Sequence, residues 1–320
     1  MTAVQLNQRS DESDSVAQSL REEPPYLGLV CITISKEVRF RTMTRTRYLQ
    51  LSEAERKNAL KNLYTDNLQR LDKAISFCQQ RNIKLYRITS ALFPLSDLED
   101  EVGAQILEEM RTDLGKIGQR ATELGIRMVL HPDQYVVLSS DSPSVLKSSL
   151  TILQRHAQNF DLLGLPRSPW ALMNIHGGKA QRQEQLIQVV NELPEAIKSR
   201  LTFENDEYAY SAQEILEVCQ RTGVPMVFDA HHHVCHEQLS SYEDPSVAEM
   251  FYAARETWAN PEWQLVHISN GETAFNDRKH SEFITAMPSV YRHAPWIEIE
   301  AKAKEEAIAR LEKEWLVVSG

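Results

Sequence analysis

Eight short apolar runs, each followed by a longer amphipathic stretch, dominate this sequence. Each run has four to seven residues that are mostly apolar or β-branched, as in strands that are buried on both faces. The predicted strands are 27–33, 84–88, 127–131, 171–176, 201–204, 225–229, 264–268 and 296–300. Strands that alternate with helices in one unbroken series predict an α/β protein, a single (β/α)₈ TIM barrel. The alternative is an open doubly wound sheet, which usually has a glycine-rich turn after its first strand. The segment ISKEVRFRT that follows the first run contains no glycine.

Helix boundaries are marked by capping residues. Ser52 and Glu55 have capping-box spacing and open one predicted helix. Apolar residues from 102 to 117 predict the next, which Gly125 ends. Further helices are predicted from Ser142-Pro143 to Gly164, from Ser211 to Gly223, and over 301–311.

Composition limits the class of protein. Residues 1–23 are polar and acidic, which predicts a disordered tail, and 24–320 contain no compositional break and form one predicted domain. No run approaches the roughly 20 apolar residues of a membrane span. Four isolated cysteines favour a reducing, cytoplasmic setting. The net charge of −10 argues against nucleic-acid binding through an overall positive charge, although acidic residues gathered around metal ions remain compatible with it. No obligate protein partner is indicated.

Metal-binding side chains follow the predicted strands. All ten histidines lie after residue 130, and six successive strands end in histidine, aspartate or glutamate. These residues are His131, His176, Glu204, Asp229, His267 and Glu300. The carboxyl ends of barrel strands converge on one mouth, where active sites are built. Imidazoles and carboxylates without thiolates suit Zn²⁺ or Mn²⁺. So many ligands predict two or three ions with a shared carboxylate, an arrangement that serves phosphodiester hydrolysis.

The histidine run after the sixth strand, DAHHHVCH, is predicted to be a loop that turns only some of its side chains inward. Asp229 and His232 are the predicted ligands. His231, His233 and His236 are expected to be exposed to solvent or to lie behind the ligands. We expect His156 and His293 to be structural.

Several motifs occur in an order that resembles the UV damage endonucleases, metal-dependent DNA repair enzymes whose barrel is similar to that of apurinic endonuclease IV. The motifs are LHPDQY (130–135), NIHGG (174–178), ENDE (204–207), DAHHH (229–233), VHIS (266–269) and EAKAKE (300–305). The resemblance covers about residues 24–311 and implies nicking of the backbone 5′ to UV-induced lesions, pyrimidine dimers and 6-4 photoproducts, in double-stranded DNA.

The resemblance also implies roles for individual residues. One ion would be held by His131, His176 and Glu204, and a second by Glu204, Asp229, His267 and Glu300. A third would be held by His232 and His280. Glu204, Asp229 and Glu300 are then the candidate catalytic residues, and Gln134 and Tyr135 would probe the damaged dinucleotide.

Two positions depart from the family pattern. Leu29 stands where the family often has tyrosine, so one aromatic contact to DNA is expected to be missing. Leu265 stands where the family can have a lysine near the metals, which affects how the third ion would be held.

Two other functions are alternatives to DNA cleavage. A metal-dependent sugar isomerase or epimerase would use the same barrel and the same kind of ligands, but in a closed pocket. A metal-storing scaffold fits poorly with ligands placed where reactive sites form. The segment 39–47, RFRTMTRTR, follows the first strand and would reach the mouth. Its residues Arg41, Arg45 and Arg47 are predicted to contact DNA phosphates.

Overall fold

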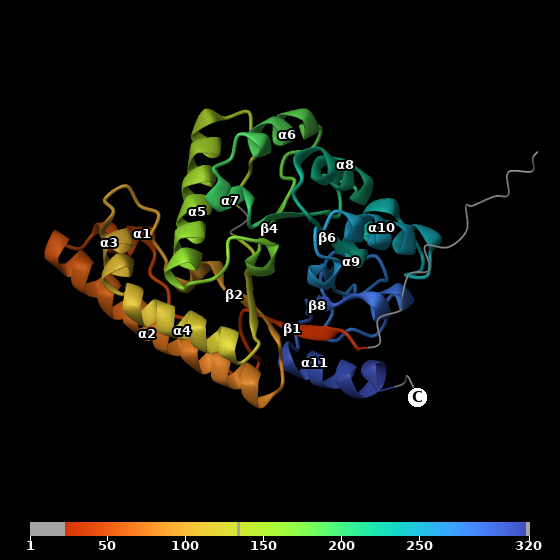
Figure 1. Ribbon diagram of the computed structural model, residues 1–320, viewed down its shortest axis with the longest axis horizontal. Coiled ribbons are helices and arrows are strands. Elements are labelled where there is room, and N and C mark those ends of the chain that lie inside the picture. Colours follow the sequence, from red (N-terminus) through yellow and green to blue (C-terminus); the bar gives the residue numbers. More distant parts are fainter. Residues whose placement is uncertain (1–22, 133–134, 318–320) are drawn as a thin grey trace, which may run out of the picture.

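Eight parallel strands close into a barrel in the computed structural model of the protein, which describes residues 23–132 and 135–317 (Figure 1). Each strand pairs with its neighbours in the chain, and the eighth pairs with the first. The strands are β1 Tyr26–Val30, β2 Leu85–Ile88, β3 Arg127–Leu130, β4 Met173–His176, β5 Leu201–Glu204, β6 Met226–Asp229, β7 Leu265–Ile268 and β8 Trp296–Ile299. The predicted (β/α)₈ barrel is therefore confirmed, and the open sheet is excluded.

Helices surround the barrel and connect its strands (Figure 1). They are α1 Arg45–Leu49, α2 Glu53–Gln80, α3 Val102–Glu109, α4 Arg111–Glu123, α5 Pro143–Leu162, α6 Gln183–Asn191, α7 Glu195–Lys198, α8 Ala212–Thr222, α9 Ala230–Glu237, α10 Pro245–Glu256 and α11 Glu305–Leu311. None of these described helices is both long enough and apolar enough to cross a lipid bilayer. The tail predicted for residues 1–23 lies outside the described residues except for Glu23, and it stays a prediction.

The capping residues act as predicted. Glu55 accepts a hydrogen bond from the backbone N–H of Ser52 at the start of α2 (2.8 Å). Ser211 and Glu214 bond reciprocally at the start of α8 (2.9 and 3.2 Å). That helix ends at Gly223, whose φ of 74° lies in the left-handed region, which glycine adopts without strain.

Three local predictions were wrong. The helix predicted over 102–117 is interrupted at Met110, where ψ is 5°, so it forms α3 and α4. The last helix begins at Glu305 rather than at 301, because the N–H groups of Lys302 and Ala303 donate to Ser281 and Glu282 instead of continuing a helix. The histidine run forms α9 instead of a loop, because Asp229 caps it.

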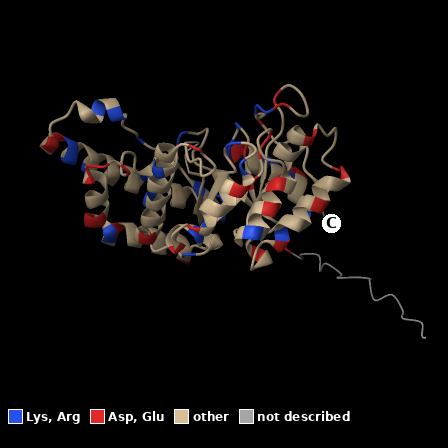
Figure 2. Cartoon of the chain, turned by 90° about the horizontal axis from the view of Figure 1, so that it is seen from above, with Lys and Arg blue, Asp and Glu red and all other residues tan. Residues whose placement is uncertain are grey.

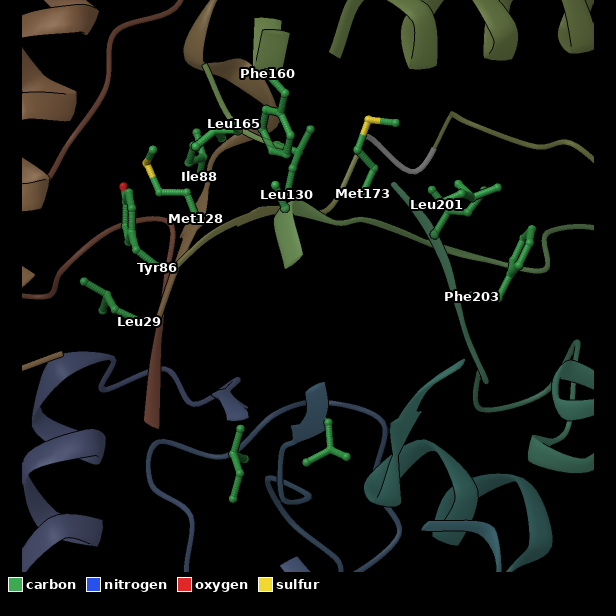
Figure 3. Close-up of a cluster of buried hydrophobic side chains, with 14 of the residues drawn as sticks. Leu29, Tyr86, Ile88, Met128, Leu130, Phe160, Leu165, Met173, Leu201 and Phe203 are labelled. Carbon is green, nitrogen blue, oxygen red and sulfur yellow. The ribbon is translucent and has the colours of Figure 1, made fainter. Parts of the chain in front are cut away.

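The strands separate two apolar clusters, because successive side chains point to opposite faces of a strand. Figure 3 shows the outer cluster, with side chains such as Leu29, Met128 and Phe203 pointing away from the barrel axis. Leu29 is fully buried there. A side chain at this position therefore packs against the helices and does not face the mouth.

The inner cluster fills the lower part of the barrel. It contains Leu85, Val129, Leu172, Val227, Trp258, Leu265 and Trp296. Arg127 is buried beside it, with its guanidinium 4.9 Å from the Trp170 ring and 5.3 Å from the Trp296 ring. Leu265 thus belongs to an apolar floor two residues below His267. Arg127 is buried at the level of this floor, and the candidate ligands lie above it.

Candidate metal centre

Glu204 lies at the centre of the barrel mouth and is 1% exposed. Its Oε2 atom lies 3.7 Å from His131 Nε2 and 3.9 Å from His176 Nε2. Its Oε1 atom lies 3.1 Å from His267 Nδ1 and 3.2 Å from His232 Nδ1. The two oxygens of one carboxylate therefore face two different sets of imidazoles, which is the arrangement that a bridging ligand requires.

The first set joins the ends of three neighbouring strands. His131 directly follows β3, His176 ends β4 and Glu204 ends β5, and one ligand atom from each lies within 4.8 Å of the others. His131 directs Nδ1 to the Pro132 carbonyl (3.0 Å), which leaves Nε2 on the Glu204 side. Both imidazoles are partly exposed, at 24% and 34% of the side chain. This set can therefore be reached from solvent.

Asp229 contributes to a second set with Glu204 and His232. Its Oδ1 atom accepts hydrogen bonds from the backbone N–H groups of His231 and His232 (2.6 and 2.8 Å), which fixes the carboxylate as the cap of α9. Its buried Oδ2 atom has no hydrogen-bond partner among the described residues. A buried carboxylate oxygen without a partner is costly, and a cation would satisfy it.

A third set contains His267, Glu300 and a residue that the sequence analysis missed, Glu298. Glu298 lies on β8, one inward position below Glu300, and its Oε2 atom is 2.7 Å from His267 Nε2. Arg87 on β2 reaches both glutamates, with Nη1 at 3.0 Å from Glu298 and 2.6 Å from Glu300. The alternation of inward positions along the last predicted strand could have identified Glu298, because it lies two residues before Glu300 and therefore on the same face. The second predicted strand carries no candidate ligand, so the sequence held no such signal for Arg87.

The structure places the remaining predicted ligands as follows. His280 lies in the segment between β7 and β8, with Nδ1 3.9 Å from Glu300 Oε2. His232 directs Nδ1 to the Asn205 carbonyl (2.9 Å) and holds Nε2 3.9 Å from Glu207. Among the described residues, no compact set of three ligands contains both His232 and His280.

The other histidines of α9 face away from the mouth. His231 is fully buried and lies between the Tyr242 hydroxyl (2.7 Å) and the Asp277 carbonyl (2.9 Å). His233 is also buried and contacts Ser246 (3.0 Å), whereas His236 contacts Glu237 (3.0 Å). Of the two expected alternatives, solvent exposure is excluded for His231 and His233, because the helix turns them into the protein interior.

The centre carries a surplus of buried negative charge. Burial would raise the pKa of Glu204, but His267 and His176 outweigh it and hold the pKa well below its ordinary value. Burial would lower the pKa of His232, but Asp229 and Glu204 outweigh it and raise the pKa well above its ordinary value. Among the described residues, Arg87 is the one permanent cation within 4.0 Å of Glu204, Asp229, Glu298 or Glu300. Four carboxylates and one guanidinium favour the binding of further cations.

One tyrosine lines a cavity on the accessible side of the centre. A cavity of about 520 Å³ includes His131, His176, Glu207 and Tyr208 in its lining. Tyr208 directly follows the ENDE motif, is 69% exposed, and has the Arg278 guanidinium 4.8 Å from its ring. Sequence reasoning missed Tyr208, although its position next to ENDE was a usable signal. Tyr135 is 70% exposed, and Gln134 lies outside the described residues.

The basic segment after β1 lies on the side of the mouth. Figure 2 shows a short helix with basic residues, α1, that stands out at one end of the molecule. Arg45 and Arg47 belong to α1 and are exposed. Arg41 is exposed as well and pairs with Asp66 (3.3 Å), while its backbone is held by the buried Asn67. A rigid attachment therefore presents these guanidinium groups to solvent.

Comparison with known proteins gives consistent matches along the chain. Two proteins named UV DNA damage endonuclease are similar to it. The one from Nostoc sp. is 68% identical over 317 residues, which are 99% of this chain and 97% of that protein. The one from Deinococcus radiodurans is 49% identical and covers 91% of this chain and 95% of its own length.

Solved structures agree with these relatives. The crystal structure of SacUVDE has a TM-score of 0.76 at 25% identity and covers 92% of this chain and all of its own. Endonuclease IV from Thermus thermophilus, with a TM-score of 0.56 at 12% identity over 90% of this chain and 97% of its own, shares the fold. A family model described as UV-endonuclease UvdE matches residues 25–318. The motif resemblance is thereby confirmed, and the chain belongs to the UV-endonuclease family.

Proposed function

We propose that this protein is a metal-dependent hydrolase that nicks double-stranded DNA 5′ to UV-induced lesions and so starts excision repair. Membership in the UV-endonuclease family supports DNA as the substrate. The observation that carries the metal dependence is the central Glu204, whose two oxygens face His131 and His176 on one side and His232 and His267 on the other.

The side chains fit two or three divalent ions, with Mn²⁺ or Zn²⁺ favoured by the mixture of imidazole and carboxylate. His131, His176 and Glu204 would hold one, and Glu204, Asp229, His267 and Glu300 a second. His232 and His280 are proposed for a third. The buried atom Asp229 Oδ2, which has no hydrogen-bond partner among the described residues, supports this assignment, because a buried polar atom needs a partner.

The reaction adds water to the phosphorus and breaks its bond to the 3′-oxygen, leaving a 3′-hydroxyl and a 5′-phosphate. When bound, divalent ions supply a Lewis acid for the phosphate and a source of hydroxide at neutral pH. The protein supplies fixed geometry: Asp229 is locked as a helix cap and Glu204 is buried, so neither carboxylate has to reorganise when charge develops on the phosphate.

DNA binding is assigned to residues around the mouth. Arg41, Arg45 and Arg47 would contact phosphates, and their local charge overcomes the net charge of −10. Gln134 and Tyr135 would read the lesion. A dimer already weakens base stacking, so extruding it costs less than extruding intact bases, and that difference provides selectivity.

A sugar isomerase on the same barrel is not favoured. Exposed Tyr135 and the exposed arginines of α1, in the segment that leaves the carboxyl end of β1, suit a polyanionic polymer, whereas a small sugar needs an enclosed pocket. We also propose a cytoplasmic location, which accords with four unpaired cysteines in the structure.

The test is nicking of a supercoiled plasmid that is UV-irradiated, abasic or undamaged. We expect strong nicking of irradiated plasmid, complete loss with a chelator, and recovery with Mn²⁺. An end-labelled duplex with one pyrimidine dimer should be cut on the 5′ side of the dimer. Chelator-resistant cleavage, or equal nicking of all three plasmids, would contradict the proposal.

A further inference from the structure

A layer of polar side chains lies directly beneath the candidate ligands, between them and the apolar floor of the barrel. Arg87, Asn174 and Glu298 are buried at inward positions of β2, β4 and β8. Each contacts a different candidate ligand. Polar groups are expensive inside a barrel unless they are satisfied, so three of them under the mouth call for an explanation.

Asn174 contacts the central carboxylate. Its Nδ2 atom donates to Glu204 Oε2 (2.5 Å), and its Oδ1 atom accepts from the Thr202 hydroxyl (2.9 Å). The threonine donor fixes which end of the amide faces upward, because an amide oxygen accepts and an amide nitrogen donates. Asn174 therefore holds the Glu204 carboxylate from below, in the orientation in which its two oxygens face different sets of imidazoles.

Arg87 contacts two carboxylates at once. It donates from Nη1 to Glu298 Oε2 (3.0 Å) and Glu300 Oε1 (2.6 Å). One guanidinium thus keeps two neighbouring glutamates on β8 in fixed places despite their mutual repulsion.

Glu298 contacts an imidazole. Its Oε2 atom lies 2.7 Å from His267 Nε2, while the other ring nitrogen, Nδ1, faces Glu204 (3.1 Å) and Glu300 (3.6 Å). Carboxylates behind ligating histidines commonly fix the tautomer and the ring orientation. Neither ring nitrogen makes an aligned hydrogen bond to the described residues, so Glu298 faces Nε2 as a charge partner and leaves Nδ1 toward the mouth.

We propose that Arg87, Asn174 and Glu298 are positioning residues that orient Glu300, Glu204 and His267 for metal binding, and that Glu298 makes Nδ1 the ligand atom of His267. This inference rests on the proposed metal-dependent function. Glu298 could instead be a ligand itself, since its Oε1 atom makes no hydrogen bond to the described residues. The two roles differ in what they predict for the number of bound ions.

The test measures Mn²⁺ binding to the metal-free protein by calorimetry, without DNA. The variants are Glu298→Gln, Asn174→Ala and Arg87→Met, with Arg87→Lys to restore a positive charge without the planar guanidinium. Arg200→Met is the control, because Arg200 is also buried but directly precedes β5, at the end of the barrel opposite the mouth, and pairs with Asp161. We expect unchanged stoichiometry with affinity weakened about 10- to 100-fold in the first three variants, a smaller loss in Arg87→Lys, and wild-type affinity in the control.

The outcomes separate the possibilities. Wild-type affinity in folded Glu298→Gln and Arg87→Lys would overturn the positioning role. Loss of one whole ion per chain in Glu298→Gln would make Glu298 a ligand and overturn its assignment here. If the wild-type protein itself binds no Mn²⁺, the proposed metal-dependent function is contradicted, and with it the positioning role of Arg87, Asn174 and Glu298. Should Arg87→Met not fold, Arg87→Lys decides.

Discussion

Replacing Tyr135 with alanine is expected to weaken recognition of UV-damaged DNA without loosening the fold. The side chain is 70% exposed, and its hydroxyl makes no hydrogen bond to the described residues. An exposed side chain of this kind contributes within about 0.5 kcal/mol to the free energy of unfolding. The melting temperature should therefore stay close to that of the wild-type protein.

The size of the binding effect follows from the exposed ring. A fully buried tyrosine removes about 150–250 Å² from water, so 70% of it leaves roughly 105–175 Å² available for DNA. If one face of the ring stacks on bases, about half of that area is covered, worth about 1.3–2.2 kcal/mol at ~25 cal/mol per Å². This range lies within the ~1–3 kcal/mol found for base–aromatic stacking. It corresponds to an affinity loss of about 10- to 40-fold.

The assay compares binding of irradiated and undamaged duplex by fluorescence anisotropy, at one fixed salt concentration, together with metal content and melting temperature. Tyr135→Phe is the matched control and should keep wild-type preference, because stacking needs the ring and not the hydroxyl. A Tyr135→Ala variant that binds damaged DNA normally but melts several degrees lower would refute the reasoning. Tyr135 would then be a packing residue, and the lesion reader would lie elsewhere.

Three other perturbations test separate parts of the account. Glu204→Gln should lose bound metal and nearly all nicking, because two ions would lose their shared negative ligand. Elemental analysis measures the metal content, and His156→Ala, the control, should keep it in full. A folded Glu204→Gln variant with full metal content would contradict the bridging role. Arg45→Ala combined with Arg47→Ala should weaken binding to damaged and undamaged duplex about equally and reduce the slope of log affinity against log salt by about 2. A loss confined to damaged DNA would instead make these arginines lesion readers. Burial would raise the pKa of Asp161, but two neighbouring arginines outweigh it and hold the pKa below its ordinary value. The ion pairs of Asp161 therefore stabilise the fold above about pH 4, and this stability is lost as the pH falls through the lowered pKa. Urea unfolding should therefore show Asp161→Asn less stable than wild type at pH 7, with the difference shrinking below about pH 4; a constant difference would contradict this.

The sequence by itself determined the barrel and the candidate ligands at its strand ends. Short apolar runs that alternate with capped amphipathic stretches have few ways to bury both faces of every strand, and a parallel barrel is one of them. Once that topology is given, the carboxyl ends of the strands must meet. His131, His176, Glu204 and Asp229 could thus be brought together without coordinates, because their positions depend only on local periodicity and strand order.

Only the tertiary structure decided what surrounds those ligands. Arg87 meets Glu298 across 211 positions of sequence because the closed barrel brings β2 and β8 to opposite sides of β1. His231 and His232 are adjacent in the chain, yet one is buried against Tyr242 and the other faces the mouth, because Asp229 caps a helix there. Contacts of this kind depend on the register and closure of distant strands and on which way a capped helix turns. Periodicity along the chain carries no information about either, so these contacts become known only when the barrel is closed.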